Sequence, residues 1–275
     1  MHNYGVIATD LDGTLLDDLR QLSERNRTAL LAARAQGITV IAATARTPRG
    51  LHLVPGLPDT VDYAICNNGA VLYEPGTGAV DVRHTIPAAA VRDLHLRARE
   101  ALPDALFTIE TGTAIIAEGT DPAARVHYGE PWHAVTAIED ALADLDGVVE
   151  YRVQHRTVDG PAMRAALDGI ATPGMVRWAW GSYPVLEYNA DTVNKGAALA
   201  EWCAERGVAA EAVIAFGDMP NDVSMLAWAG RSYAMAGAPA DVVAAAGFAA
   251  ASNNDDGVAQ AVEALLRDPE PVPAD

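Results

Sequence analysis

Apolar runs of strand length alternate with helical segments through the first third of the chain. Residues 38–43 and 63–66 form continuous apolar runs, as in strands covered on both faces, and a shorter run at 4–8 ends just before Asp10. A helix is predicted from an N-cap at Ser23 to about Gln36, where Gly37 ends it. This alternation favours a parallel sheet with helices on both of its faces.

The last third of the chain repeats the same alternation. The predicted elements are a helix over 195–205, a strand over 213–216, a helix over 221–229, a strand over 231–235 and a helix over 255–266. Both ends of the chain are therefore expected to build one parallel-sheet domain.

The middle of the chain has a different pattern. Strand-like runs at 148–153 and 175–180 are mixed with helical segments at 88–101, 137–145 and 161–170. The predicted fold class is therefore α/β. A Rossmann-like parallel-sheet core is expected from residues 1–82 and 190–275, with an α+β domain inserted over residues 83–189.

The composition adds a strong negative charge to this picture. The chain has 275 residues, with 37 Asp and Glu against 19 Lys and Arg, which gives a formal net charge of −18. Such a surface repels phosphate backbones and anionic lipid, so nucleic-acid and membrane partners are not expected. A site for a small phosphorylated metabolite would need local cations of its own.

The cysteines and the apolar segments of the chain indicate the cellular compartment in which the protein is expected. Cys66 and Cys203 form no CxxC pattern, which leaves a disulfide scaffold and a zinc ribbon unsupported. The first residues contain no basic and long apolar signal segment, and the apolar stretch over 242–251 is too short to span a bilayer. We therefore expect a cytoplasmic protein, and both a monomer and a homodimer fit the sequence.

Polar residues follow the apolar strands at their carboxyl ends, where open α/β sheets bind ligands. These residues are Asp10 and Asp12 after the first strand, Thr44 and Arg46 after the second, Lys195 at a helix start, and Asp218, Asn221 and Asp222 after a late strand. Acids, a hydroxyl and an ammonium thus converge from distant segments on one edge of the sheet.

The segment Asp10-Leu11-Asp12-Gly13-Thr14 is the sharpest of these signals. Two carboxylates at i and i+2 after a buried strand repel each other, unless a cation or a proton compensates. Gly13 permits a tight loop whose backbone amides can face an anion. Taken alone, such a turn also serves as a helix cap, and a lone lysine such as Lys195 is more often solvated. The occurrence of all these polar segments together, each at the end of a predicted strand or the start of a helix, favours a ligand-binding site.

These segments resemble the motifs of the haloacid dehalogenase superfamily of phosphohydrolases. Asp10-Leu11-Asp12-Gly13-Thr14 resembles motif I, Thr44 motif II, Asn194-Lys195-Gly196 motif III and the stretch from Gly217 to Asp222 motif IV. Asn67-Asn68-Gly69-Ala70 and the run from Ala234 to Val258 also match, as in the Cof-type branch, which carries a large C2 cap between motifs II and III. The resemblance covers nearly the whole chain. One departure is Ala45, where this branch usually has glycine.

The resemblance implies a role for each matching residue. Asp10 would be the nucleophile and Asp12 the general acid and base. Mg²⁺ would be held by the carboxylates of Asp10 and Asp218 and by the main-chain carbonyl of Asp12. The phosphate would be bound by the Thr44 hydroxyl, the amides of Leu11 and Ala45, Lys195 and Asn221, while Asp222 would orient Lys195 or the metal shell. Arg46 and Asn68 lie near the same edge and are candidates for contact with the substrate beyond its phosphate, with a structural role as the alternative.

The leading hypothesis is a Mg²⁺-dependent phosphatase of a small phosphorylated metabolite, such as a sugar phosphate, acting through an aspartyl-phosphate. A phosphotransferase or hexose-phosphate mutase, and a phospho-acceptor module without turnover, are the alternatives. Arg and His residues in the inserted domain could recognise the rest of the substrate, although a structural role is the more frequent one for such residues. The candidates are Arg125, His127, Tyr128, Trp132, His133, Arg152, His155, Arg156 and Arg177, and none of them is assigned to the site. Trp178 and Trp180 alternate as strand residues do, and one or both of them are expected in a core.

Overall fold

The structure is a computed structural model that describes residues 4–118 and 130–267. The chain divides into two compact units. The core unit comprises Met1–Ala79 and Asn194–Asp275, and the inserted unit comprises Val80–Val193. The sequence analysis sets these boundaries after residues 82 and 189, a few residues from those of the structure. Within the described residues, no helix combines the length and apolar character that crossing a membrane requires.

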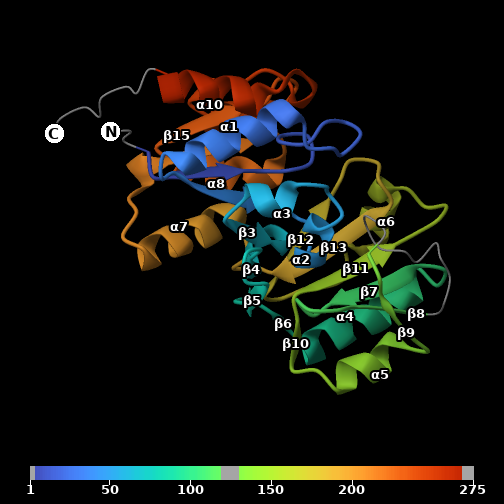
Figure 1. Cartoon of the computed structure of the whole chain (residues 1–275). Helices are drawn as coiled ribbons and strands as arrows, with labels where there is room; N and C mark the ends of the chain where they lie inside the picture. Colours follow the sequence, from blue (N-terminus) through green and yellow to red (C-terminus); the bar gives the residue numbers. More distant parts are fainter. Residues whose placement is uncertain (1–3, 119–129, 268–275) are drawn as a thin grey trace. The chain divides into compact units, whose positions relative to one another are not determined.

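A mostly parallel sheet forms the centre of the core unit (Figure 1). Its strands in chain order are β1 (Val6–Thr9), β2 (Thr39–Ala43), β3 (Tyr63–Cys66), β4 (Val71–Glu74), β5 (Ala79–Val82), β14 (Val213–Gly217), β15 (Arg231–Ala234) and β16 (Phe248–Ala249). They lie in the order β16-β15-β14-β1-β2-β3-β4-β5. The pairs from β16 to β3 are parallel and β4 runs antiparallel to β3, so the predicted parallel α/β core is confirmed.

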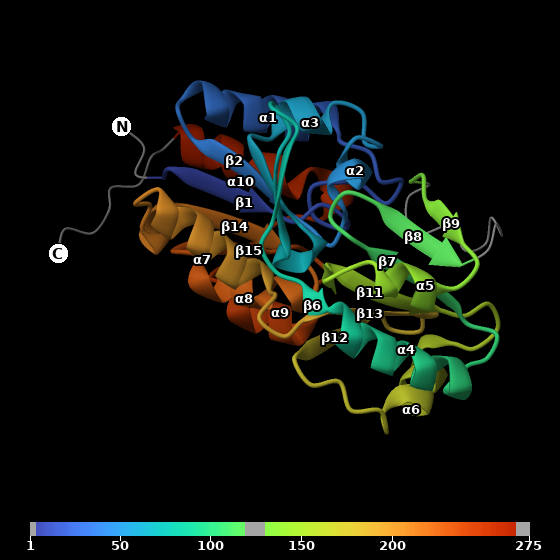
Figure 2. The same ribbon diagram turned by 90° about the horizontal axis from the view of Figure 1, so that it is seen from below.

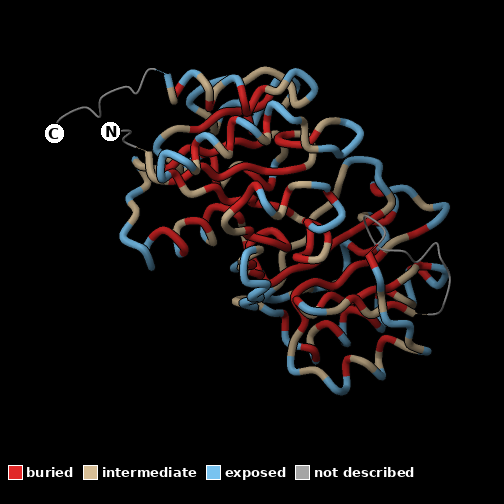
Figure 3. The backbone as a smooth tube through the Cα atoms, in the orientation of Figure 1, coloured by how far each residue is buried: buried red, intermediate tan, exposed pale blue. Residues whose placement is uncertain are grey.

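Helices cover both faces of this sheet (Figure 2). The helices of the core unit are α1 (Glu24–Ala35), α2 (Pro48–Leu51), α3 (Leu57–Thr60), α7 (Lys195–Glu205), α8 (Val223–Trp228), α9 (Ala240–Ala245) and α10 (Gly257–Arg267). One face packs against α7, α8 and α9 through side chains that include Leu199, Trp202 and Met225. Figure 2 shows α1 and α10 on the other face, and the central strands between the two helical layers are buried (Figure 3).

A buried asparagine ties the loop after β1 to this helical layer. Ser23 caps α1, as predicted, because its side chain accepts a hydrogen bond from the Asn26 amide. Asn26 is 1% exposed. Its Nδ2 donates to the Leu15 carbonyl, and its Oδ1 accepts from the Ala259 amide of α10. Loss of this side chain would leave buried polar groups without partners, so Asn26 fixes the loop that carries Asp10 and Asp12.

The inserted unit contains a six-stranded sheet in the order β12-β13-β11-β7-β8-β9 and a small two-stranded sheet of β10 and β6. Its elements are β6 (Ile86–Pro87), α4 (Ala88–Ala101), β7 (Leu106–Glu110), β8 (Ile115–Glu118), β9 (His133–Val135), α5 (Ile138–Ala143), β10 (Gly147–Val148), β11 (Glu150–Gln154), α6 (Gly160–Leu167), β12 (Met175–Ala179) and β13 (Val185–Ala190). All pairs in the larger sheet are antiparallel except that of β8 with β9. The unit is therefore α+β, as predicted.

The sequence analysis missed several strands of the inserted unit, including β7, β8 and β13. Strand β13 is buried along its whole length although it contains Glu187 and Asn189. These polar residues interrupt the apolar run that marks a buried strand. Glu187 pairs with Arg152 of β11 and Asn189 donates to the Val149 carbonyl, contacts that a local pattern does not reveal. The helix predicted over 221–229 also begins differently, with a 3₁₀ turn at Pro220–Asp222 before α8.

Candidate active site

The loop after β1 brings motif I against Asp218 at the end of β14. Strands β1 and β14 are parallel neighbours, and the Asp10 amide donates to the Phe216 carbonyl. Gly13 has a φ of +86°, and a Cβ on it would lie 2.4 Å from the Asp218 carboxylate, so no other residue fits without displacement. The Thr14 hydroxyl donates to Asp218 Oδ1 at 2.8 Å, which fixes that carboxylate beside the loop.

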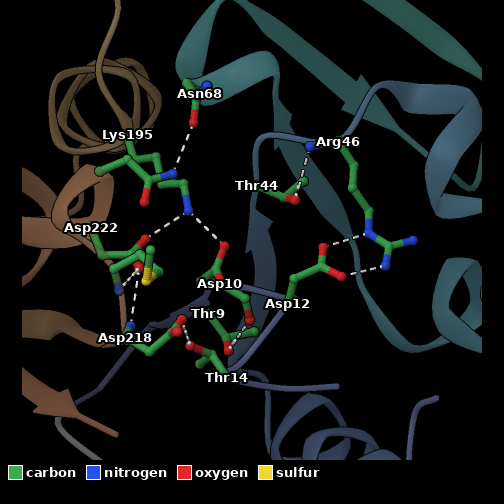
Figure 4. Close-up of polar contacts among 12 residues, drawn as sticks. Thr9, Asp10, Asp12, Thr14, Thr44, Arg46, Asn68, Lys195, Asp218 and Asp222 are labelled. Atoms are coloured by element: carbon green, nitrogen blue, oxygen red, sulfur yellow. Dashed lines mark hydrogen bonds and ion pairs between the residues drawn. The ribbon is translucent and has the colours of Figure 1, made fainter. Parts of the chain in front are cut away.

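Lys195 is the only lysine in the chain, and it points into this site. It begins α7, behind an N-cap at Asn194, and is 1% exposed. Its Nζ donates to Asp10 Oδ1 and to Asp222 Oδ1, both at 2.6 Å (Figure 4). A lysine at this depth stays charged only with such partners, so the usual solvated role does not apply here.

Both oxygens of Asp222 have partners within the protein. Oδ1 accepts from Lys195, while Oδ2 accepts from the amides of Asp218 and Met219 at 3.1 and 3.0 Å. A Cβ on Gly217 would lie 2.5 Å from the Cβ of Asp222, which explains the glycine at the end of β14. Asp222 therefore holds Lys195 and the motif IV turn in place.

Burial and mutual repulsion shift the pKa values of these acids. Burial raises the pKa of Asp10 well above its ordinary value; Lys195 opposes this shift, and the charges of Asp222 and Asp218 add to it. Burial, together with the charge of Asp222, raises the pKa of Asp218 to about 6. Burial alone would lower the pKa of Lys195, but Asp10 and Asp222 raise it above its ordinary value. The site thus contains more negative charge than its own ammonium balances.

The chemistry of this group of side chains fits a divalent metal ion. Carboxylate oxygens of Asp10, Asp218 and Asp222 all lie within 4.8 Å of one another. Three ionised carboxylates and one ammonium leave two negative charges, which one divalent cation would balance. Oxygen ligands of this kind are those that Mg²⁺ prefers. Because both oxygens of Asp222 already have partners, Asp10 and Asp218 are the side chains that fit a metal best.

Asp12 lies on the other side of the loop and is paired with Arg46. The guanidinium donates twice, from Nε to Asp12 Oδ2 at 2.7 Å and from Nη2 to Oδ1 at 2.6 Å. Figure 4 shows the Asp12 side chain directed toward Arg46 rather than toward Lys195. The Arg46 side chain is 2% exposed, and Asp12 is 33% exposed. The sequence analysis offers Arg46 as a substrate contact, whereas in the structure its guanidinium holds the second acid of motif I.

The remaining predicted phosphate-binding residues lie in the loops after β1 and β2. Thr44 is buried, and its hydroxyl accepts from the Arg46 amide at 3.0 Å, which leaves its own proton to donate. Ala45 is half-buried. Leu11 is buried, and its carbonyl accepts the Leu16 amide at 2.8 Å, which closes the loop of motif I. The glycine that Ala45 replaces is not required for this loop to form.

Asn68 and Asn221 form a side-chain pair next to Lys195. Asn221 Nδ2 donates to Asn68 Oδ1 at 2.9 Å, and both residues are buried. An amide nitrogen carries two hydrogens, so Asn221 retains a second N–H beyond this bond. The sequence analysis names both residues but not their contact, because residues 68 and 221 are remote in the chain.

In the inserted unit, the predicted candidates are mostly held in ion pairs and hydrogen bonds. Arg152 is buried and pairs with Glu150 and Glu187, and Arg177 pairs with Asp168. His155 accepts from the Thr157 and Val158 amides, Trp178 and Trp180 are half-buried, and Trp180 donates to Glu187. Trp132 and Arg156 also have interactions of their own, His133 is exposed, and Arg125, His127 and Tyr128 lie outside the described residues.

The structure also reveals a group in the inserted unit that the sequence spacing conceals. His95 of α4, Glu118 of β8 and Glu139 of α5 bring ligand atoms within 4.8 Å of one another. Arg99 lies among them and donates to Glu118, to Glu139 and toward His95 Nε2. A guanidinium in this position already supplies the positive charge, so the group is an ionic network that joins three elements.

Comparison with known proteins identifies the family. The sequence profile of the haloacid dehalogenase-like hydrolases matches residues 7–262. The chain belongs to this family. YxeH of Bacillus subtilis is 30% identical over 272 residues, which cover 96% of this chain and 98% of YxeH. The pyridoxal phosphate phosphatase YbhA of Escherichia coli is 26% identical, with coverage of 95% and 98%.

Solved structures agree on the fold. A haloacid dehalogenase-like hydrolase from Bacteroides thetaiotaomicron superposes with a TM-score of 0.82 at 24% identity, covering 95% of this chain and 99% of that one. The resemblance to the Cof-type branch, the α/β fold class and the prediction of a hydrolytic enzyme of this family are therefore confirmed. The match to YxeH extends over both units of the chain.

Proposed function

We propose that this hydrolase is a Mg²⁺-dependent phosphatase that cleaves a small phosphorylated metabolite, a sugar phosphate being one example, through an aspartyl-phosphate. The observation that carries the proposal is the pairing of Asp10 with Lys195 beside Asp218. An anionic nucleophile meets an anionic phosphate with a repulsion of about 4 kcal/mol at 4 Å and an effective dielectric of 20. Bound Mg²⁺ would supply positive charge against this repulsion and would polarise the phosphoryl oxygens.

Asp10 and Asp218 would hold the metal, with the Asp12 main-chain carbonyl as a further oxygen donor. Lys195 fixes one oxygen of Asp10 and so orients the carboxylate for in-line attack on phosphorus. The Thr44 hydroxyl, the Leu11 and Ala45 amides and the second N–H of Asn221 would bind the other phosphoryl oxygens.

Two proton transfers by Asp12 would complete the reaction. As Asp10 bonds to phosphorus, the bond to the ester oxygen breaks, and Asp12 donates a proton to that oxygen. Asp12 then removes a proton from water, which attacks phosphorus, releases inorganic phosphate and restores the Asp10 carboxylate. Since both oxygens of Asp12 accept from Arg46, its protonation requires at least one of those bonds to be exchanged.

Release of phosphate from p-nitrophenyl phosphate with and without Mg²⁺ tests the proposal. We expect steady turnover with Mg²⁺, loss of turnover in Asp10→Asn, and normal turnover in the exposed control Asp144→Asn. A single burst of p-nitrophenol, equal to the enzyme concentration and without release of inorganic phosphate, would indicate a phospho-acceptor module. The phosphotransferase alternative predicts that a hexose 1-phosphate yields an isomeric phosphate and no inorganic phosphate. Either result would contradict the phosphatase assignment.

A further inference from the structure

The chain leaves β3 through two consecutive asparagines with a rare backbone conformation. Asn67 has a φ of +48° and Asn68 of +58°, and both are 0% exposed. Few residues other than glycine adopt this left-handed region, although asparagine tolerates it best. The Asn67 amide donates to the Arg46 carbonyl and the Asn68 amide to the Thr44 carbonyl, which locks both against the loop after β2. Such overdetermined backbone is typical of functional sites.

The pair of Asn68 with Asn221 leaves hydrogen-bonding capacity on each side chain. The bond from Asn221 Nδ2 to Asn68 Oδ1 uses one donor and one acceptor. Asn68 Nδ2 and Asn221 Oδ1 are buried and have no hydrogen-bond partner among the described residues. If both amides were turned over, one amide nitrogen and one amide oxygen would still remain, so this conclusion does not depend on their orientation. Buried polar groups are normally satisfied, which points to a ligand.

This pair lies beside the reaction centre of the core unit. Asn221 directly precedes Asp222, whose carboxylate holds Lys195, and Lys195 holds Asp10. Figure 4 shows the Asn68 side chain directed toward Lys195, with Thr44 across from it. A group bound by the two amides would therefore be close to the phosphoryl group that the proposed function places on Asp10.

We propose that the Asn68–Asn221 pair binds a hydroxyl group of the substrate, on the carbon next to the phosphorylated carbon. The substrate class is then the phosphate monoester of a polyol or sugar. This inference rests on the proposed phosphatase function and assigns the part of the substrate that the core unit itself recognises.

The chemistry of the free groups selects a hydroxyl. A hydroxyl both donates and accepts, so it can accept from the free amide nitrogen and donate to the free amide oxygen. A second phosphate or a carboxylate can only accept and would be repelled by that oxygen, while an ammonium can only donate.

Two substrates that differ by one hydroxyl test the assignment. Propane-1,2-diol 1-phosphate has the adjacent hydroxyl and n-propyl phosphate lacks it. We expect kcat/KM of the wild-type enzyme to favour the diol phosphate by about 10–100-fold, as two net hydrogen bonds would provide. Propane-1,3-diol 1-phosphate, with its hydroxyl one carbon further away, should be hydrolysed no faster than n-propyl phosphate.

Variants of Asn68 separate recognition of the substrate hydroxyl from a general loss of activity. Asn68→Gly keeps the backbone conformation and removes the amide, and Asn68→Asp keeps the oxygen that faces Asn221 but removes the donor. In both, the preference for the diol phosphate should fall to within about threefold. The control for the backbone change is Arg20→Gly, which replaces an exposed residue with a similar φ of +60° and should preserve the preference.

The ratio of kcat/KM for propane-1,2-diol 1-phosphate to kcat/KM for n-propyl phosphate decides the outcome. Because the two kcat/KM values come from the same enzyme, changes in phosphate affinity cancel in their ratio. Equal kcat/KM for both substrates in the wild-type enzyme, or an unchanged preference in the Asn68 variants, would overturn the assignment. Absence of phosphate release from every substrate would instead overturn the proposed function. If the variants fail to fold, the wild-type comparison still gives a decisive result.

Discussion

Replacement of Lys195 by methionine should destabilise the core unit strongly. Each of its two ion pairs spans 2.6 Å, which corresponds to a Coulomb attraction of about 6 kcal/mol at an effective dielectric of 20. Most of that attraction is offset by the desolvation of buried ions. Removal of one partner, however, leaves the carboxylates of Asp10 and Asp222 buried and uncompensated, at a cost of about 3–5 kcal/mol. We expect the free energy of unfolding of the core unit to fall by that amount in metal-free buffer.

The assay must report on the core unit alone, because the two units can unfold separately. Hydrogen exchange followed by mass spectrometry resolves them, because peptides from Met1–Ala79 and Asn194–Asp275 report on the core unit alone. A loss of about 3–5 kcal/mol lowers the melting temperature by roughly 6–20 °C for a unit of this size. The control is Arg25→Met, which breaks an exposed pair with Glu263 and should cost under about 1 kcal/mol. Equal stability of Lys195→Met and Arg25→Met would refute the reasoning.

Three further predictions follow from the geometry. Gly13→Ala should reduce phosphate release at least about tenfold because its Cβ meets the Asp218 carboxylate, whereas Gly37→Ala, with a similar φ but open space, should not. Mg²⁺ at 100 times its Kd should raise the free energy of unfolding by about 2.7 kcal/mol, measured by thermal melting against EDTA, and Asp218→Asn should lose most of this gain. Burial lowers the pKa of His95, so the folded unit holds it neutral. Stability should therefore decline as pH falls below about 6.5, less so in His95→Asn, as denaturation at pH 7.5 and 5.5 would reveal.

The sequence predicts those parts of the fold that local patterns determine. Strand β3 and helices α4 and α7 lie at the predicted residues, because continuous apolar runs, caps and glycine stops act within a few residues of each other. Convergence of Asp10, Lys195 and Asp222 was also predictable, since the carboxyl ends of parallel strands share one edge. Strand β13 was not, because its buried polar residues find partners only in the folded sheet.

The contacts of the individual side chains could not be read from the sequence. Arg46 and Asn68 were recognised as polar residues near the site, but their orientation depends on neighbours from other segments. The Arg46 guanidinium meets Asp12, 34 residues away, and Asn68 meets Asn221, 153 residues away. Spacing along one segment says nothing about such pairs. The sequence analysis did not predict the group of His95, Glu118 and Glu139 for the same reason, since each of these residues comes from a different element.

The two buried cations of the site are each committed to an acid. Lys195 holds Asp10, and Arg46 holds both oxygens of Asp12, so neither faces the substrate as an unpaired charge. On a protein with a net charge of −18, a phosphate therefore meets no unpaired side-chain cation from this pair, while the third N–H of Lys195 remains able to donate to a phosphoryl oxygen. Under the proposed mechanism, further positive charge beside Asp10 would come from the metal and from backbone amides. Under the same mechanism, we expect the two cations to act mainly on the position and protonation of the acids, that is, on kcat, and metal affinity to govern whether the phosphate binds.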